Sequence, residues 1–296
     1  MLAIVIPYYK ITFFEETLES LANQTDKRFK VYFGDDASPE EPRFLLNKYK
    51  EQIDFVYHRF EENLGGNSLT KQWERCIALS ADEEWLMILG DDDVLGNNVV
   101  ESFYYYYKEF NEQSNVVRFA SVLLNEQDLT VSKKYEHPKL EKGIDFFIRK
   151  LKWETRSSLS EYFFKRDVYL KYYFKEYPSG FYSDDRAWFD FSEDKPIYTI
   201  NESIVKVRIS NYSLSGTADK DVLKHAEFLY LKYFYKNKLS CLSKKNRIFI
   251  LKKIEFYYCF SHTDNFKSWF YLYIKYWNVF DIRELYRFHK RILLKS

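Results

Sequence analysis

The chain has 296 residues, of which 46% are apolar and 20% are aromatic, so it is long enough to bury a sizeable core. Its formal net charge is +1, and we expect no nucleic-acid partner. The three cysteines, Cys76, Cys241 and Cys259, fit neither a disulfide framework nor a zinc site, which favours a reducing compartment. Because no signal peptide or bilayer-spanning apolar run is evident, we expect a cytoplasmic protein or one bound peripherally at the inner face of the cell membrane.

Short apolar runs alternate with segments of helical periodicity over the first 122 residues. The expected strands are Leu2–Ile6, Phe29–Phe33, Phe55–Tyr57, Trp85–Leu89 and Val116–Val122. The expected helices are Thr12–Ala22, Pro42–Tyr49, Leu69–Leu79 and Asn97–Phe110. Strands that alternate with helices through short loops predict βαβ units and a Rossmann-like, mainly parallel sheet flanked by helices.

The rest of the chain is less regular at first and then helical. Residues 125–165 show no clear pattern, and two short strands are expected at Ile197–Ile200 and Ile204–Ile209. From about Asp221 to Lys295 the periodicity is helical throughout. We therefore expect an α/β domain over residues 1–215 and a helical C-terminal region over residues 216–296.

The strongest chemical signal is the run Asp91-Asp92-Asp93, which follows the fourth expected strand. Three adjacent carboxylates repel each other unless a cation lies among them, and hard oxygen ligands suit Mg²⁺ or Mn²⁺ bound jointly with substrate phosphates. The alternative is a helix start, in which Asp93 caps the helix and interacts with its dipole.

Two acidic pairs give weaker signals. Asp35-Asp36 follows the second expected strand, at the sheet edge where ligands bind in open α/β folds, although Asx-turns explain most such pairs. Asp184-Asp185 precedes an aromatic segment, where a carboxylate can act as a general base toward a hydroxyl. Alternatively, this pair lies at the start of a helix, with Ser183 as its cap.

Taken in order, the short motifs of this chain resemble those of the family 2 glycosyltransferases. They are Pro7-Tyr8-Tyr9, residues 18–24, Asp35-Asp36-Ala37-Ser38, Asn63-Leu64-Gly65-Gly66, Leu89-Gly90-Asp91-Asp92-Asp93, and Asp184-Asp185 with Trp188. The resemblance covers residues 3 to about 210 and is specific because order and spacing agree. It implies the GT-A fold, here with a C-terminal helical extension.

The resemblance also implies roles for individual residues. The donor-binding residues would be Pro7 and Tyr9 in the nucleotide pocket, Asp36 or Asp35 at the base, Lys71 near the donor, and Asp91 at the ribose. Asp92 and Asp93 would bind Mn²⁺ or Mg²⁺, and Asp185 would be the catalytic base beside Asp184. Gly90 stands where many members have the first aspartate, and Asp184 stands where glutamate is usual, so the register of both motifs is open.

The activity implied is an inverting transfer of a sugar from a nucleotide-diphosphate donor, with a UDP-sugar favoured, to an acceptor hydroxyl in glycan or surface polysaccharide synthesis. The acceptor would be a glycan or a lipid-linked molecule. One alternative is a sugar nucleotidyltransferase, although residues 8–11 do not form the glycine-rich phosphate loop that such an enzyme normally has. The other is a non-catalytic carbohydrate-binding scaffold on the same fold.

Charge is distributed unevenly along the chain. Residues 1–219 carry a net charge of −10, whereas residues 220–296 carry +11 together with many aromatic side chains. Basic and aromatic residues mixed on helices suit the boundary between water and lipid. They are also expected where helices pack against the catalytic domain or another subunit. We therefore expect the C-terminal helices to contact a membrane peripherally, to pack against the catalytic domain or to mediate oligomerisation.

Overall fold

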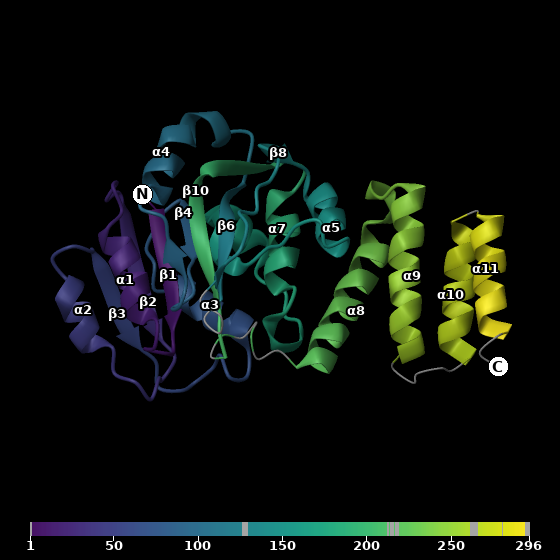
Figure 1. Cartoon of the computed structure of the whole chain (residues 1–296), viewed down its shortest axis with the longest axis horizontal. Coiled ribbons are helices and arrows are strands. Elements are labelled where there is room, and N and C mark those ends of the chain that lie inside the picture. The colour runs from purple at the N-terminus through teal and green to yellow at the C-terminus, as the bar shows by residue number, and fades with distance from the viewer. Residues whose placement is uncertain are drawn as a thin grey trace. The chain divides into compact units, whose positions relative to one another are not determined.

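The chain forms two compact units, Met1–Asp219 and Lys220–Ser296. They run from purple to green and from green to yellow in Figure 1. The structure, a computed structural model, describes residues 2–125, 130–211, 213, 216, 219–260, 266–279 and 281–293. The first unit is an α/β domain and the second consists of helices.

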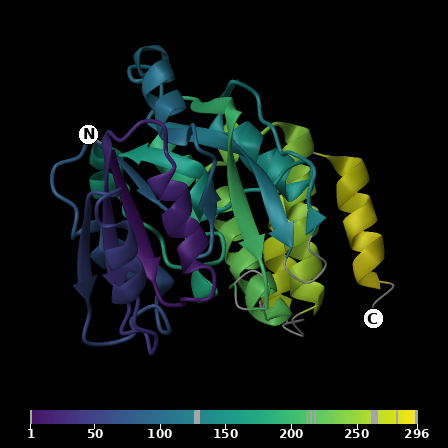
Figure 2. The same cartoon turned by 60° about the vertical axis from the view of Figure 1, so that its left-hand side comes forward.

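One twisted sheet of ten strands forms the centre of the first unit (Figure 2). Its main strand order is β3-β2-β1-β4-β9-β6-β10-β5, with β7 paired to β6 and β8 paired to β10. The strands are β1 (Leu2–Tyr8), β2 (Phe29–Asp35), β3 (Phe55–Arg59), β4 (Trp85–Ile88), β5 (Val94–Leu95), β6 (Val116–Asn125), β7 (Thr130–Val131), β8 (Leu140–Glu141), β9 (Tyr162–Lys165) and β10 (Ile197–Ile209).

Parallel pairing dominates this sheet, as the sequence predicts. The four parallel pairings are β1 with β2, β1 with β4, β2 with β3, and β6 with β10. Each of them joins more residue pairs than any antiparallel pairing does. The five antiparallel pairings each join only two or three residue pairs. Strand β9 runs antiparallel between β4 and β6, so its first residues lie beside the end of β4, and Tyr162 pairs with Arg118 near the start of β6.

Some local elements were not predicted, and one prediction differs from the structure. Strand β9 and helix α5 (Gly143–Leu151) lie in or close to the stretch that shows no clear pattern, and β5 has only two residues. The two strands expected between Ile197 and Ile209 are one strand, β10, whose pairing with β6 shifts register between Ile200 and Ile204. Polar residues at the register shift, Asn201, Glu202 and Ser203, make the apolar pattern look interrupted.

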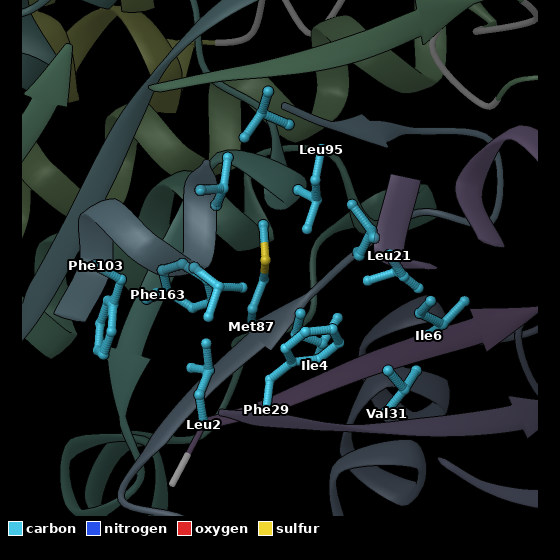
Figure 3. Close-up of a cluster of buried hydrophobic side chains, with 14 of the residues drawn as sticks. Leu2, Ile4, Ile6, Leu21, Phe29, Val31, Met87, Leu95, Phe103 and Phe163 are labelled. Carbon is cyan, nitrogen blue, oxygen red and sulfur yellow. The ribbon is translucent and has the colours of Figure 1, made fainter. Parts of the chain in front are cut away.

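Alternate side chains of the strands enter two hydrophobic clusters, one on each face of the sheet. Leu2, Ile4 and Ile6 of β1 join one cluster, shown in Figure 3, while Ala3 and Val5 join the other. The first cluster is covered by α1 (Phe14–Ala22), α2 (Arg43–Tyr49) and α4 (Val99–Phe110). The second is covered by α3 (Leu69–Ile77), α5, α6 (Arg166–Tyr172) and α7 (Ser183–Ser192).

The second unit contains α8 (Lys220–Asn237), α9 (Lys244–Phe260), α10 (Phe266–Asn278) and α11 (Ile282–Leu293). This confirms the predicted helical periodicity as far as the structure describes it; Lys295 lies outside the described residues. Buried carboxylates are paired inside the unit, since Glu255 accepts hydrogen bonds from Tyr276 and Arg291. Among the described residues, no helix is long and apolar enough to cross a bilayer.

A buried ion network links β6, β8 and α5 in the first unit. The fully buried Arg118 donates to Glu141 at 2.8 Å and to Thr199 at 3.1 Å. Arg149 reaches the other carboxylate oxygen of Glu141 at 2.7 Å. Removing one member of such a network leaves a buried charge without its partner, which is far more costly than losing an exposed pair.

We therefore expect Glu141→Gln to lower the free energy of unfolding by about 3–5 kcal/mol, because the Arg118 charge stays buried without its carboxylate. Glu15→Gln is the matched control, since the pair of Glu15 with Lys48 is exposed and its loss should leave the urea midpoint unchanged. Urea unfolding followed by circular dichroism measures both, and equal midpoints for the two variants would contradict the expectation.

Candidate active site

Two of the three predicted acidic clusters lie at the ends of parallel strands, whereas Asp184 and Asp185 lie in helix α7. The loop after β1 begins at Tyr9, the loop after β2 begins at Asp36, and the segment Gly90–Asp93 follows β4. Because these strands are parallel, their ends meet at one edge of the sheet, where open α/β folds bind ligands. A 3₁₀ turn, η1 (Leu159–Glu161), reaches the same edge because it precedes the reversed strand β9.

The segment Gly90–Asp93, here called the acidic segment, is attached to the loop after β1 and to α1. One carboxylate oxygen of Asp91 accepts hydrogen bonds from the backbone N–H groups of Tyr9 at 2.7 Å and Lys10 at 2.8 Å. The Thr17 hydroxyl contacts the carbonyl oxygens of Asp91 at 3.2 Å and Asp93 at 2.9 Å. The position of Asp91 is therefore set by backbone donors of a neighbouring loop.

Asp93 is attached to two other parts of the sheet edge. Its carboxylate accepts hydrogen bonds from the Ser160 hydroxyl of η1 and, at 2.8 Å, from the backbone N–H of Arg208 in β10. Ser160 also accepts from the backbone N–H of Gly90 at 2.9 Å. The residue after Asp93 enters strand β5, and helix α4 begins only at Val99, so the prediction that Asp93 caps a helix is wrong.

Asp92 differs from its two neighbours. In the described structure, no hydrogen bond from a neighbouring residue reaches its carboxylate, although Arg208 donates to its carbonyl oxygen at 2.9 Å. Burial, with the charges of Asp93 and Asp91, raises the pKa of Asp92 to about 8. Burial raises the pKa of Asp91 to about 6 and also raises that of Asp93. A cation beside Asp92 would relieve this crowding.

The protein alone supplies few ligands for such a cation. Over the described ranges, no group of three or more histidine, cysteine, aspartate or glutamate side chains is arranged to hold a metal ion. The hard carboxylate oxygens nevertheless match the ligand preference of Mg²⁺ and Mn²⁺. Mg²⁺ is usually held by one or two carboxylates plus substrate phosphates, which agrees with the donor set at the acidic segment.

Asp35 is fully buried and bound by the protein itself. One carboxylate oxygen accepts from the Ser38 N–H at 2.8 Å, an Asx-turn, and the other accepts from Tyr57 at 2.6 Å and Arg59 at 2.7 Å. The Asx-turn alternative therefore describes Asp35. Through its hydrogen bonds with Tyr57 and Arg59, the Asp35 carboxylate links the end of β2 to β3.

Asp36 organises the Asn63–Gly66 loop. Its carboxylate accepts from the N–H groups of Leu64 at 2.8 Å and Gly65 at 2.9 Å, and it is paired with Arg75. A side chain at Gly65 would lie only 2.5 Å from the Asp36 carboxylate, so the close approach requires glycine. Lys71 is exposed one helical turn before Arg75 on α3. The sequence indicated Lys71 but missed Arg75, although the spacing of four places both on one helix face.

Pro7 and Tyr9, the other expected donor-binding residues, connect these two loops. Both are half-buried, and Pro7 pairs in register with Gly34 near the end of β2. The Tyr9 N–H donates to Asp91, and its carbonyl oxygen accepts from the Ser38 hydroxyl at 2.6 Å. Tyr9 thus joins the acidic segment to the turn after β2.

Asp184 and Asp185 lie in the first turn of α7. The alternative that this pair begins a helix is confirmed, but the N-cap position is occupied by Tyr182, in a left-handed conformation with φ of 65°, so Ser183 is not the cap. Ser179 and Gly180, with φ of 52° and 72°, are also left-handed. Backbone strain of this kind is found at functional sites, where the surrounding structure maintains it.

The two carboxylates of this pair have different surroundings. Asp185 is buried, and one of its oxygens is paired with Lys150 of α5. Its other oxygen is buried and accepts no hydrogen bond from the described residues. Asp184 is half-buried, and burial together with the Asp185 charge raises the pKa of Asp184 to about 7. Lys150 carries no sequence signal, because it is an ordinary basic residue distant in the chain.

Residues 160–162 link the acidic segment to helix α7, which carries the second acidic pair. Ser160 donates to Asp93, whereas the ring of Tyr162 stacks on Trp188 of α7 with centroids 4.2 Å apart. Trp188 lies one turn after Asp185 and belongs to the motif that the sequence indicated. Ser160, Tyr162 and Arg208 were missed because each acts through a contact between distant segments.

Comparison with known proteins adds two findings. The sequence model described as glycosyl transferase family 2 matches residues 3–175 of the chain. None of the curated proteins matches the sequence.

Several solved structures of S. aureus TarS are similar in fold. A fragment in complex with UDP-GlcNAc has a TM-score of 0.65 and 16% identity, with 90% of this chain and 74% of that chain covered. A fragment in complex with UDP has a TM-score of 0.56 and 15% identity, with 85% and 78% covered. A longer TarS structure has a TM-score of 0.63 and 15% identity, with 96% covered, and this chain spans half of its length. The likeness shows the GT-A fold that the sequence predicts.

The hydrogen bonds of the acidic segment predict opposite effects on stability for two adjacent aspartates. Asp93→Ala should lower the free energy of unfolding by about 2–3 kcal/mol, because the buried Ser160 hydroxyl and Arg208 N–H lose their acceptor. Asp92→Ala should leave it unchanged or raise it, because the carboxyl group removed is one that burial and its neighbours make costly to ionise, and no hydrogen bond from a neighbouring residue is broken. Urea denaturation distinguishes these outcomes, and equal losses would show that the two side chains are held alike.

Proposed function

Because the chain belongs to glycosyl transferase family 2, we propose that it transfers the sugar of a UDP-sugar to an acceptor hydroxyl with inversion at the anomeric carbon. The observation that carries the proposal is the arrangement of the acidic segment. Hydrogen bonds hold Asp91 and Asp93, whereas no hydrogen bond from a neighbouring described residue reaches the Asp92 carboxylate, which can therefore bind a ligand. The UDP moiety is suggested by S. aureus TarS, the similar fold that was solved with UDP-GlcNAc and with UDP.

We propose that Asp92 and Asp93 hold Mn²⁺ or Mg²⁺ together with the donor diphosphate. Asp92 supplies the accessible carboxylate, and Asp93 supplies an oxygen that Ser160 and the Arg208 backbone already orient. When bound, the ion would neutralise charge on the departing diphosphate and make it a better leaving group.

The donor nucleotide would lie along the loops that Tyr9 joins. Asp91 and Tyr9 would flank the ribose and base, with Pro7 beneath them and Lys71 near the donor phosphates. Asp36 and Asp35 would act through the loops they hold, because the carboxylates of both already accept hydrogen bonds from the protein. Base recognition would then depend largely on the backbone that these two carboxylates position.

We assign the catalytic base to Asp185, with Asp184 beside it. The second carboxylate oxygen of Asp185 is buried and has no partner among the residues that the structure describes, and an unsatisfied acceptor of this kind is expected where a substrate hydroxyl binds. Lys150 fixes the other oxygen and so orients the carboxylate. Asp185 would take the acceptor proton as the acceptor oxygen attacks the anomeric carbon opposite the nucleotide, and this single displacement inverts the configuration.

We also propose an acceptor class and a cellular location for the reaction. The acceptor would be a hydroxyl of a glycan or a lipid-linked molecule in surface polysaccharide synthesis. We place the enzyme in the cytoplasm, including the inner face of the cell membrane, and two of its three cysteines, Cys76 and Cys241, are free. The C-terminal unit would contact either a membrane or another subunit.

The assignment of the base predicts different losses for two neighbouring variants. Asp185→Asn should reduce the transfer rate by roughly 10²–10⁴-fold, the usual contribution of a positioned general base, while UDP-sugar binding is retained. Asp184→Asn should retain most activity. Product formation from UDP-GlcNAc at saturating acceptor measures both rates, and the opposite ranking would move the base to Asp184.

The metal proposal predicts that transfer requires a divalent ion at Asp92. EDTA should abolish transfer and UDP-GlcNAc hydrolysis, Mn²⁺ should restore both, and Asp92→Asn should remain inactive at the same Mn²⁺ concentration. Thermal shift with a panel of nucleotide sugars, with and without Mn²⁺, identifies the donor. Full turnover in EDTA would contradict the metal role, and a stably folded wild type without turnover on any donor would favour a carbohydrate-binding scaffold.

A further inference from the structure

Helix α10 of the C-terminal unit presents an apolar face to solvent. Between Trp269 and Val279, where its side chains are described, the exposed positions are Phe270, Tyr273, Ile274, Trp277 and Asn278. The four apolar members of this set are 39–59% exposed and lie within an arc of about 100° around the helix axis. We call these four residues the α10 stripe. An apolar surface of this kind marks a contact site.

Basic residues accompany a second exposed apolar pair on the neighbouring helix α11. Ile282 and Tyr286 are 84% and 67% exposed, and they lie one turn apart. Arg283 and Lys290 are also exposed and fall within an arc of about 100° that includes both apolar residues. Helix α11 thus combines apolar and cationic groups on its outer side.

The charge of the unit decides between two possible occupants of this surface. Residues 220–296 carry a net charge of +11, so a second copy of the unit would bring a like charge against it. An anionic surface, in contrast, is attracted to this unit and repelled by residues 1–219, which carry −10. Tyr and Trp side chains, with their amphipathic rings, suit the headgroup region of a bilayer.

We propose that the α10 stripe, with Arg283 and Lys290, docks the enzyme on an anionic phospholipid bilayer. Trp277, Ile274 and Tyr273 would enter the boundary between headgroups and acyl chains, and the cations of α11 would pair with lipid phosphates. The helix would lie flat, because no described helix can cross a bilayer. This binding is independent of the transferase reaction, so either proposal can fail without the other.

Co-sedimentation of the full-length protein with vesicles tests the proposal. The protein should bind vesicles made of equal parts phosphatidylglycerol and phosphatidylcholine at low salt. High salt should weaken binding, and pure phosphatidylcholine should retain little protein. Ile274→Ser combined with Trp277→Ser should reduce the partition constant by at least about tenfold, because two apolar side chains no longer enter the lipid.

Matched controls distinguish binding through this surface from nonspecific hydrophobic adsorption and from an effect of net charge alone. Trp153→Ser combined with Leu170→Ser removes exposed apolar groups from the first unit and should leave binding unchanged. Arg283→Glu with Lys290→Glu should weaken binding to anionic vesicles, whereas Lys50→Glu with Lys108→Glu, which gives the same change in net charge on the first unit, should have much less effect. Trp277→Tyr, a milder change that retains an interfacial ring, should still bind.

Three results would overturn the proposal. The first is a wild type that ignores anionic vesicles at low salt. The second is an Ile274→Ser/Trp277→Ser protein that is folded by circular dichroism and binds like the wild type. The third is a dimer, seen by sedimentation velocity, that this double variant abolishes while vesicle binding persists, since the stripe would then be an interface between copies of the chain.

Discussion

The fold must hold three adjacent carboxylates at one edge of a sheet, and the candidate active site depends on how it does so. Hydrogen bonds hold the outer two in place: backbone N–H groups of Tyr9 and Lys10 bind Asp91, while Ser160 and the Arg208 backbone bind Asp93. The middle one, Asp92, has a pKa raised to about 8 by burial and by its neighbours. Because no hydrogen bond from a neighbouring described residue reaches this carboxylate, it can ionise when a cation and its phosphate ligands bind beside it.

The topology of the sheet explains how the hydrogen-bond donors from distant segments come to lie beside the acidic segment. Strand β9 is reversed between β4 and β6, so the turn before it carries Ser160 to the edge where the parallel strands end. The end of β10 brings Arg208 to the same segment. Tyr162, two residues after Ser160, stacks on Trp188 of the helix that begins with Asp184 and Asp185. The short antiparallel strand and the turn before it therefore link the acidic segment to helix α7, which carries the second acidic pair.

Local pattern was sufficient to predict the first four strands, the helices between them and the loops that carry the acidic residues, because βαβ units alternate apolar runs with turn residues. It was insufficient where contacts between distant segments decide the outcome. Strand β9 has four residues, and β10 is interrupted by polar residues at its register shift. The partners Arg75, Lys150 and Ser160 lie 39, 35 and 67 residues from the carboxylates they bind, so no short motif includes both members of a pair. The left-handed Tyr182 cap is likewise maintained by its surroundings.

The most direct test of this account is a crystal structure of the enzyme with Mn²⁺ and UDP, in which anomalous scattering locates the ion. We expect one Mn²⁺ peak at coordination distance, about 2.1 Å by analogy with Mg²⁺, from the Asp92 and Asp93 carboxylates and the UDP diphosphate. Asp93 should still accept its hydrogen bonds from Ser160 and Arg208. A Mn²⁺ ion bound away from Asp92, or UDP bound at the acidic segment without any metal, would contradict the central claim.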